Sequence, residues 1–308
     1  MKVVFFGTPE FAVPTLECLN ASRHNLVAVI TQPDRPKGRG RKLTQTPIKQ
    51  IAEKFGYDVL QPDSVRDSSF CRSLENLKPD LLVVVAFSIL PKKILRIPTL
   101  GSINLHPSLL PAYRGAAPIV WAIANGESIT GLTTFLLNAN IDSGNILLQN
   151  EVPISPEETT GQLEKRLSGL GAKLVIETID GLEDEKLDPK PQSKTGISYA
   201  PKLTKDDGRI DWTQPASTIH NRIRAFNPFP GAYTEHNYER LRIHRSLCVE
   251  TQYEEPGQII EATPGGRLLV ACGQNSISLL ELQPAGKNRM SSSAFLNGNK
   301  LEIGQVLN

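Results

Sequence analysis

Short apolar runs alternate with stretches of helical periodicity along the first third of the chain. The predicted strands are residues 3–6, 26–31, a short run near Val59, and 81–87, and the predicted helices are residues 8–20, 47–55 and 66–77. Thr8 and Pro9 have the residue types of a helix N-cap and a first helical position, so the first helix is expected to begin there. Strands that alternate with helices of this length predict an α/β fold with a doubly wound, mostly parallel, Rossmann-like sheet.

The chain changes in character near residue 183. Residues 159–182 carry leucines at helical spacing, and the following residues 183–208 are rich in charged residues, proline and serine, which is typical of a linker. After a predicted helix over 216–226, short β runs at 240–245, 258–262, 267–272 and 276–282 are separated by turn residues, which predicts a small β-barrel. We therefore predict one domain over 1–189, a linker over 190–207 and a second domain over 208–308.

The composition narrows the possible function classes. The 34 basic and 32 acidic residues give a formal net charge of +2, so a nucleic-acid contact must come from a local cluster of charge. The four cysteines form no Cys-x-x-Cys pair and the five histidines show no zinc spacing, so neither a disulfide framework nor a metal site is expected. The chain has no apolar run near 18 residues and no signal-peptide pattern, which predicts a cytoplasmic protein that does not enter a membrane.

One cluster of charge follows the second predicted strand directly. Five of the eight residues from 35 to 42 are basic, namely Arg35, Lys37, Arg39, Arg41 and Lys42. The prolines and glycines at 33, 36, 38 and 40 are expected to prevent a regular helix or strand. The segment is then either a cationic loop that holds phosphates or a solvated charge run, which is the commoner fate of such segments.

Residues 101–118 carry the strongest candidate for catalytic chemistry. They begin as a short alternating strand, in which Asn104 and His106 face one side while Ile103 and Leu105 face the other, and they continue as a loop with prolines and a glycine. A carboxamide and an imidazole fixed where a strand meets a loop suit catalysis. The same pattern also fits a structural role, in which the asparagine forms a turn and the half-buried histidine is hydrogen-bonded within the protein.

The ends of several predicted strands are expected to meet. Ligands of open α/β sheets bind beyond the carboxyl ends of the strands, near a reversal in strand order. Residues 7–8, 87–88, 104–106 and the loop around Asp142 lie at such ends. We expect them to converge on one crevice.

Several segments carry the motifs of a known family. Phe-Phe-Gly-Thr-Pro-Glu-Phe begins at residue 5, Thr-Gln-Pro-Asp-Arg-Pro at 31, Ile-Asp-Ser-Gly at 141 and Arg-Ala-Phe-Asn-Pro-Phe-Pro at 224, besides Asn-x-His and Ser-Leu-Leu-Pro within 101–118. Through these segments, which are spread nearly from end to end of the sequence, the chain resembles the folate-dependent formyltransferases. The basic segment favours the branch of that family that acts on tRNA. The resemblance implies a C-terminal OB-like barrel that binds tRNA. It also implies a monomer that transfers the formyl group of 10-formyltetrahydrofolate to the amino group of methionyl initiator tRNA without a metal.

The resemblance also implies which residues bind and react. Asn104 and His106 would stabilise the oxyanion and the leaving nitrogen of an acyl transfer, and Asp142 would orient His106 and handle protons. Arg114 would meet the acidic tail of the folate, meet the tRNA, or only pin its loop. The folate cosubstrate would contact Phe87, Ser88, Ile89, Leu90, Ser108, Leu109, Leu110 and Pro111, and the tRNA would contact Arg35, Lys37, Arg39, Arg41 and Lys42.

The chain departs from the family pattern at two places. These are Phe87 and Ser88 in place of Tyr-Gly, and Asn138, Asn140 and Asn145 in place of a carboxylate, a glycine and a second carboxylate near Asp142. Because Asn140 tolerates a positive φ, the turn is expected to survive. The lost negative charge is expected to shift the titration of the His106–Asp142 pair, in a direction that the sequence does not set.

Three other functions fit parts of the pattern. A formyl transferase for glycinamide ribonucleotide or an amino sugar would share the three catalytic residues, although the basic segment and the second domain argue against it. A hydrolase would release formate from formyl-folate without an amine acceptor. A non-catalytic RNA-binding module would not need the three residues. The arginines of the C-terminal part either follow an RNA backbone or are solvated surface, and they include Arg222, Arg224, Arg240, Arg242 and Arg245.

Overall fold

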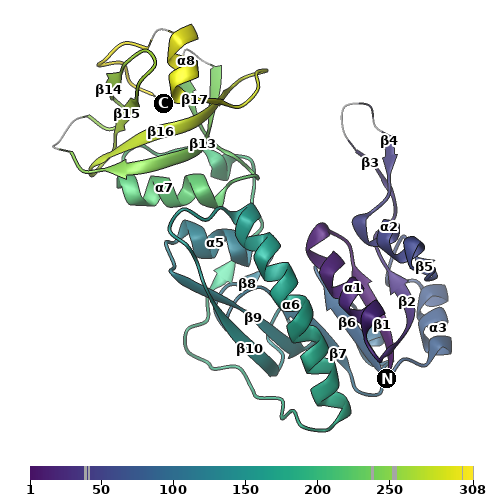
Figure 1. The fold of residues 1–308 in the computed structure, drawn as a ribbon. Helices are drawn as coiled ribbons and strands as arrows, with labels where there is room; N and C mark the ends of the chain where they lie inside the picture. Colours follow the sequence, from purple (N-terminus) through teal and green to yellow (C-terminus); the bar gives the residue numbers. More distant parts are fainter. Residues whose placement is uncertain (38–39, 41, 237–238, 252–254, 300, 308) are drawn as a thin grey trace. The chain divides into compact units, whose positions relative to one another are not determined.

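The computed structural model describes residues 1–37, 40, 42–236, 239–251, 255–299 and 301–307. The chain forms two compact units (Figure 1). The first is made of Met1–Pro118, Ile129–Pro153 and Glu164–Ala200, and the second of Ile119–Ser128, Ile154–Leu163 and Pro201–Asn308. Two segments that come before residue 164 thus belong to the second unit, and the division at residues 189 and 208 stays a prediction. In the described part of the chain, no helix has the length and apolarity to cross a membrane.

The first unit is built on a seven-stranded sheet in the order β10-β9-β7-β6-β1-β2-β5. Its strands are β1 (Lys2–Gly7), β2 (Asn25–Ile30), β5 (Val59–Leu60), β6 (Leu81–Val85), β7 (Ser102–His106), β9 (Ile129–Leu136) and β10 (Ile146–Pro153). Neighbouring strands from β5 to β7 are parallel, while β9 is antiparallel to β7 and β10 is antiparallel to β9. The predicted mostly parallel sheet is confirmed, and β9 and β10 are strands that the hydrophobic pattern did not predict.

Helices cover both faces of this sheet (Figure 1). They are α1 (Val13–Ala21), α2 (Pro47–Lys54), α3 (Ser68–Leu77), α4 (Lys92–Leu95) and the long α6 (Thr160–Glu183), and the short α5 (Pro118–Ala124) follows the loop after β7. Phe70 of α3 and Ile94 of α4 pack with Val4 and Phe6 of β1 in one buried cluster. Every residue of β6 is buried, as its unbroken apolar run predicts.

The faces of β7 are assigned by its contact with α6. Gly171 of α6 lies so close to Leu105 that a Cβ on the glycine would stand 2.5 Å from the Leu105 side chain. Leu105 therefore faces α6. Asn104 and His106 alternate with it along the strand and face the opposite side of the sheet, as the sequence predicts.

The first helix begins later than expected. Residues Glu10–Ala12 form a 3₁₀ turn, and α1 starts at Val13 instead of Pro9. The Thr8 hydroxyl does not cap the helix, because it accepts a hydrogen bond from the backbone N–H of Gln32 at 3.4 Å. The prediction of a helix from residue 8 was wrong because the hydroxyl bonds to the segment that follows the neighbouring strand β2.

The basic segment is more regular than expected. β3 (Arg35–Lys37) and β4 (Lys42–Thr44) form an antiparallel hairpin in which Pro36 lies opposite Leu43. A two-stranded ribbon has an unpaired edge on each strand, so a proline without an N–H is tolerated there. The expectation that prolines and glycines would prevent a strand was therefore wrong for this hairpin, while Arg39 and Arg41 lie outside the described residues.

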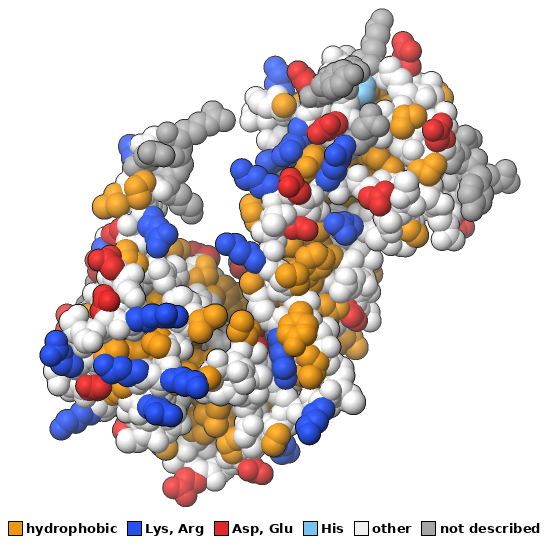
Figure 2. Space-filling view, turned by 180° about the vertical axis from the view of Figure 1, so that it is seen from behind, with side chains coloured by type: hydrophobic (Ala, Val, Ile, Leu, Met, Phe, Trp, Pro, Cys, Tyr) orange, Lys and Arg blue, Asp and Glu red, His pale blue; other side chains and the backbone are white. Residues whose placement is uncertain are grey.

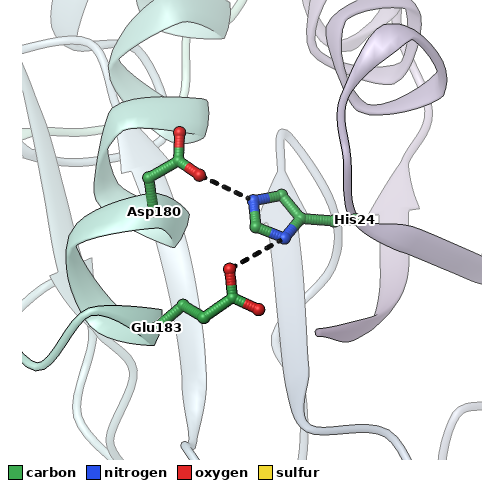
Figure 3. Close-up of side chains that lie close together, drawn as sticks. All are labelled: His24, Asp180 and Glu183. Carbon is green, nitrogen blue, oxygen red and sulfur yellow. Dashed lines mark ion pairs between the residues drawn. The ribbon is translucent and has the colours of Figure 1, made fainter.

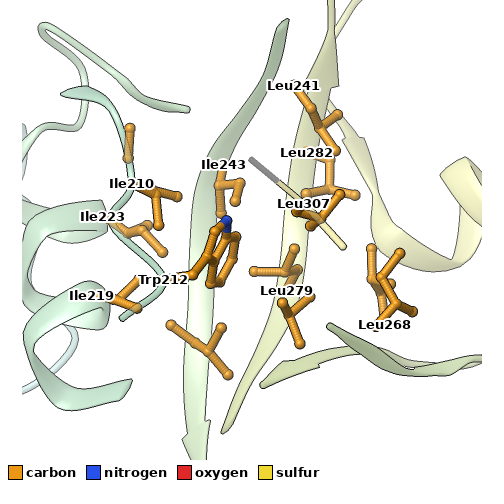
Figure 4. Close-up of a cluster of buried hydrophobic side chains, with 14 of the residues drawn as sticks. Ile210, Trp212, Ile219, Ile223, Leu241, Ile243, Leu268, Leu279, Leu282 and Leu307 are labelled. Carbon is orange, nitrogen blue, oxygen red and sulfur yellow. The ribbon is translucent and has the colours of Figure 1, made fainter. Parts of the chain in front are cut away.

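The second unit is an antiparallel β-rich domain of the predicted OB-like kind. Its strands follow the order β12-β13-β16-β15-β14, with β17 paired to β16. They are β12 (Ala232–His236), β13 (Glu239–Val249), β14 (Ile259–Ala262), β15 (Leu268–Ala271), β16 (Ser276–Pro284) and β17 (Met290–Ser291), with helices α7 (Ala216–Ala225) and α8 (Ser292–Gly298). Side chains from both helices and from the strands form one buried cluster, which includes Ile219, Trp212 and Leu279 (Figure 4). The Trp212 indole N–H donates to Thr234 Oγ1 at 3.0 Å, so the buried ring keeps a hydrogen-bond partner.

The core of the second unit gives a stability prediction. Leu279 is fully buried, so Leu279→Ala should lower the free energy of unfolding by about 2–5 kcal/mol, because both transfer energy and packing are lost. Urea unfolding followed by tryptophan fluorescence measures this change. Leu247→Ala is the matched control, since that side chain on β13 is 43% exposed and its truncation should cost less than about 0.5 kcal/mol. Equal losses in the two variants would contradict the assignment of the core.

Candidate active site

The carboxyl ends of three central strands meet at one edge of the sheet. β1 lies between β2 and β6, so the chain runs outward through β2 and β5 on one side and through β6 and β7 on the other. The strand order therefore reverses between β1 and β6, and Gly7 is paired with Val85 there, next to β7. Ligands of open α/β sheets bind at such a reversal. The predicted convergence of residues 7–8, 87–88 and 104–106 is borne out by this strand order.

His106 ends β7 and is almost completely buried. Its Nε2 lies 2.9 Å from the carbonyl oxygen of Tyr113, and because a carbonyl only accepts, Nε2 carries the proton. Its Nδ1 lies 3.8 Å from Asp142 Oδ2. Burial lowers the pKa of His106, and the Asp142 charge and the Tyr113 carbonyl oppose this shift in part. Burial therefore favours the neutral imidazole, with the lone pair of Nδ1 on the side of Asp142.

Asp142 lies in the loop between β9 and β10 and is held through its carboxylate. The backbone N–H of Gly115 donates to Oδ2 at 2.8 Å. The residue has φ 46°, a left-handed conformation that costs a residue with a side chain about 1–2 kcal/mol. The loop also packs tightly at Gly144, where a Cβ would collide with the Leu136 carbonyl oxygen.

The asparagines near Asp142 keep the turn without carboxylates. Asn138 Oδ1 accepts from the backbone N–H of Asn140 at 2.9 Å and from the Ser143 hydroxyl at 3.1 Å. An amide oxygen thus makes the turn bonds that a carboxylate oxygen would make. Asn140 tolerates a positive φ but has none in the structure, and in this loop the positive φ lies at Asp142.

Asn104 lies in the middle of β7, between Val84 of β6 and Phe135 of β9. It is half-buried and on the same face as His106. Within the described residues, its carboxamide has no hydrogen-bond partner. Its N–H donors are therefore available to a ligand at the end of the strand.

The predicted folate segment after β7 uses its side chains within the protein. Ser108 is fully buried and donates to the Ala112 carbonyl at 2.6 Å, and Leu110 is also buried. Leu109 packs onto Gly131, whose Cβ would overlap its side chain. Pro111 follows a cis peptide bond. The contact of this segment with folate stays a prediction, and the backbone groups of the segment would have to make that contact.

The second predicted folate segment follows β6. Phe87 stacks edge-on against Phe6 with ring centroids 5.4 Å apart, and Leu90 belongs to the same buried cluster. Ser88 Oγ accepts from the Gln32 side chain at 3.3 Å. Ile89 is 74% exposed, whereas Leu90 is buried. Ile89 therefore offers apolar surface to a ligand and Leu90 does not.

Residues 190–200, which the composition predicts as part of a linker, are fixed to this site. β11 (Tyr199–Ala200) pairs with β8 (Arg114–Gly115), and Gln192 contacts both Arg114 and the Asp142 loop. Of the three roles considered for Arg114, pinning its loop is the one that the structure shows, through bonds from Nε and Nη2 to Gln192 Oε1. Sequence reasoning missed Gln192, because it lies in a polar stretch without periodicity.

Comparison with known proteins identifies the family. Residues 1–179 match the formyl transferase family, and residues 202–300 match the formyl transferase C-terminal domain. The chain belongs to the formyl transferase family. It is 47% identical to a methionyl-tRNA formyltransferase of Alkaliphilus oremlandii over 309 aligned residues, which cover 100% of this chain and 99% of that protein.

Two solved structures share the fold of this formyl transferase. An N-formyltransferase from Helicobacter canadensis, in complex with folinic acid and dTDP-3-aminofucose, has a TM-score of 0.70 at 20% identity over 92% of this chain and 99% of that one. A variant of HypX from Aquifex aeolicus has a TM-score of 0.63 at 18% identity over 97% of this chain. The match spans 47% of the HypX chain. At these identities the likeness shows the fold alone.

A second cluster of titratable groups lies where β2 begins. His24 Nε2 is 3.2 Å from Asp180 and its Nδ1 is 3.8 Å from Glu183, both on α6 (Figure 3). Residues of these types can hold a metal, and their ligating atoms lie within 4.8 Å of one another. The guanidinium of Arg23 already lies 2.9 Å from each carboxylate. The geometry is that of an ion-pair network that fastens β2 to α6.

The basic side chains of this formyl transferase differ in their availability to RNA. On the face shown in Figure 2, Lys and Arg side chains are spread among acidic and apolar ones. Arg35 and Lys42 of the hairpin are exposed. Arg224 is buried and donates to Asn221 and to two backbone carbonyls, so it belongs to the packing of the second unit. Arg240 is exposed and lies 3.7 Å over the ring of Tyr233.

Proposed function

We propose that this formyl transferase moves the formyl group of 10-formyltetrahydrofolate to the amino group of methionyl initiator tRNA. The product is N-formylmethionyl-tRNA for translation initiation. One observation carries the proposal: Asn104 and His106 share one face at the carboxyl end of β7, with Asp142 next to His106, in a chain that matches a methionyl-tRNA formyltransferase over its whole length. The proposal includes a catalytic domain over 1–189, a tRNA-binding domain over 208–308, a monomeric state and a cytoplasmic location.

The three residues match the needs of acyl transfer to an amine. The amine nitrogen bonds to the formyl carbon, an oxyanion forms, and the bond from that carbon to the folate nitrogen then breaks. The amine must lose a proton and the folate nitrogen must gain one. The side-chain N–H donors of Asn104, which have no partner among the described residues, stabilise the oxyanion.

Proton transfer is the role that the geometry favours for His106. Its Nε2–H is already bound to Tyr113, so the nitrogen that can accept the amine proton and return it to the folate nitrogen is Nδ1. Asp142 Oδ2 lies on that side of the ring, and its charge stabilises the imidazolium that forms. The Tyr113 carbonyl orients the ring, so Asp142 acts mainly through its charge.

A substrate panel tests the proposal against its rivals. Purified protein is incubated with 10-formyltetrahydrofolate and, in separate reactions, charged initiator tRNA, charged elongator tRNA or a nucleotide-linked amino sugar, and the products are separated. Formyl transfer to the initiator tRNA is expected, with a much lower rate for the other two acceptors. Transfer to the sugar alone, or formate released without any acceptor, would overturn the proposal.

The pH dependence of the rate should follow His106. Its pKa is lowered by burial, so the acid limb of kcat/KM should lie below the ordinary histidine value of about 6.5. Replacing Asn138 and Asn145 by Asp adds negative charge near the imidazolium, which raises its pKa and should move the acid limb to higher pH. The pH–rate profiles of the two proteins measure the shift. Asn297→Asp, at an exposed position in the second unit, serves as the control. An unchanged profile in the double variant would show that the His106–Asp142 pair does not sense this charge.

A further inference from the structure

The strap, which we define as residues 190–200, is tied to both loops that carry the candidate active site. The backbones of Lys190 and Ile146 exchange two hydrogen bonds of 2.8 Å at the end of the Asp142 loop. Further along, the Arg114 N–H donates to the Ser198 carbonyl at 2.9 Å, and the Tyr113 N–H donates to Ser198 Oγ at 2.8 Å. Tyr113 is the residue whose carbonyl holds His106. The strap therefore contacts the supports of both proposed proton-handling groups.

Gln192 is the side chain that connects the two loops. Its Nε2 donates to the carbonyl of Asp142 at 2.8 Å and to the carbonyl of Gly144 at 2.9 Å. Its Oε1 accepts from Nε of Arg114 at 3.1 Å and from Nη2 at 2.5 Å. Both donors and the acceptor of one carboxamide are thus used, and they bridge residues 50 and 78 positions away in the sequence.

The backbone of Asp142 needs such a hold. Its left-handed conformation at φ 46° is uncommon for a residue with a side chain, so bonds to this residue help to keep the loop in one arrangement. The carbonyl that Gln192 holds belongs to the same residue as the carboxylate that the Gly115 N–H holds. Gly115 packs directly against the strap. A Cβ on this glycine would stand only 2.6 Å from the Ala200 carbonyl oxygen, and its φ is +125°, so a side chain has no room there. The backbone and the side chain of Asp142 are thus held by separate bonds, and a shift of its Cα would change the distance between the carboxylate and His106.

We propose that Gln192 is a positioning residue for formyl transfer. It fixes the backbone of Asp142 so that the carboxylate faces Nδ1 of His106, and it does so without touching either substrate. The inference rests on the proposed function, because it assigns to Asp142 a part in proton transfer.

Gln192→Glu tests the donor half of the carboxamide. The glutamate keeps an oxygen for Arg114 and adds an ion pair, so the fold is expected to hold, but its second oxygen faces two carbonyl oxygens where Nε2 donated. We expect kcat to fall roughly 10- to 100-fold, as a small misplacement of a reacting group would cause, with KM for folate and for charged tRNA changed less than about twofold. Gln192→Met, which removes donor and acceptor without adding charge, should lower kcat by a similar factor.

The control is Ser193→Ala, one position along the strap. Among the described residues, the Ser193 hydroxyl bonds to Thr195 alone, and Ser193 is exposed, so its loss should leave kcat unchanged. Thermal unfolding is recorded for each variant, and the Tm of Gln192→Glu should lie within about 2 °C of the parent. A fall in Tm by several degrees, with activity lost in proportion, would reduce Gln192 to a structural role and overturn the proposal.

Asp142→Asn, measured in the same assay, separates the two levels of inference. If Asp142→Asn is as active as the parent, the proposed catalytic site fails. If Asp142→Asn is impaired while both Gln192 variants keep the parental kcat, the site stands and the positioning role of Gln192 is overturned. Impairment of Asp142→Asn and of both Gln192 variants, each with an unchanged KM, supports the positioning role.

Discussion

Asn104→Ala should lower kcat for formyl transfer by about 10²–10³-fold, the loss typical of removing one oxyanion donor. His106→Ala and Asp142→Asn should each cost a comparable factor or more, because proton transfer contributes about 10²–10⁴-fold to such reactions. Single-turnover formylation of charged initiator tRNA at saturating folate measures the chemical step directly. The loss should appear in kcat, since none of the three side chains supplies the area that holds the pterin or the tRNA.

The variants should differ in thermal stability, because the replaced side chains differ in burial and in hydrogen bonding. His106 is buried, so His106→Ala leaves a cavity and removes the hydrogen bond to the Tyr113 carbonyl, and its Tm should fall. Asn104 is half-buried without a partner among the described residues, so Asn104→Ala should hardly change the Tm. Asn150→Ala, at an exposed carboxamide on β10, is the control for both rate and stability. Near-parental rates for all three site variants would end the assignment of the site.

Much of the fold could be predicted because local pattern reports burial. β6 is buried at every position, so its sequence has no polar alternation. β7 alternates apolar side chains on the face of Leu105 with polar ones on the opposite face. The same alternation is sufficient to predict that Asn104 and His106 share one face. Strand pairing by contrast joins distant residues, and β9, β10 and β12 carry too many polar positions for the pattern to separate them from loops.

The parts of the site that could not be predicted depend on contacts between distant residues. Gln192 bonds to Asp142 across 50 positions, and nothing in a stretch of charged residues, proline and serine marks one glutamine among them. The positive φ of Asp142 likewise follows from bonds at both ends of the residue, whereas residue type alone favoured Asn140. In the hairpin, Pro36 was expected to prevent a strand because it has no N–H to donate. At the edge of a two-stranded ribbon that N–H is not needed, so the strand forms.

The basic hairpin is the element on which tRNA binding should depend most. Its exposed cations Arg35 and Lys42 belong to a segment with a single acidic residue, Asp34, between residues 31 and 43. The Asp34 carboxylate is already paired, because Nζ of Lys49 in α2 lies 2.7 Å away, and this pairing holds the pKa of Asp34 below its usual value. The positive charge of the hairpin is therefore not neutralised by its own acid, and it is available to phosphates.

Changing Arg39, Arg41 and Lys42 to Ala should weaken the binding of charged tRNA and leave folate binding nearly unchanged. Each lost phosphate contact flattens the plot of log affinity against log salt by about 0.7–0.9, so three contacts should reduce the slope by about 2–3. The difference in affinity between parent and variant should then shrink by roughly 20- to 40-fold between 50 and 200 mM salt, which a filter-binding titration at several salt concentrations measures.

A matched charge change separates a local grip from general attraction. Lys54, Arg66 and Arg72 are exposed at and between α2 and α3, and replacing them by Ala removes the same net charge from the same unit. If the hairpin binds phosphates, only the hairpin variant should lose salt slope and raise KM for tRNA, because counterions are released where the cations touch the backbone. Equal, small losses in both variants would mean that the tRNA senses only the overall charge and that the hairpin cations are solvated surface.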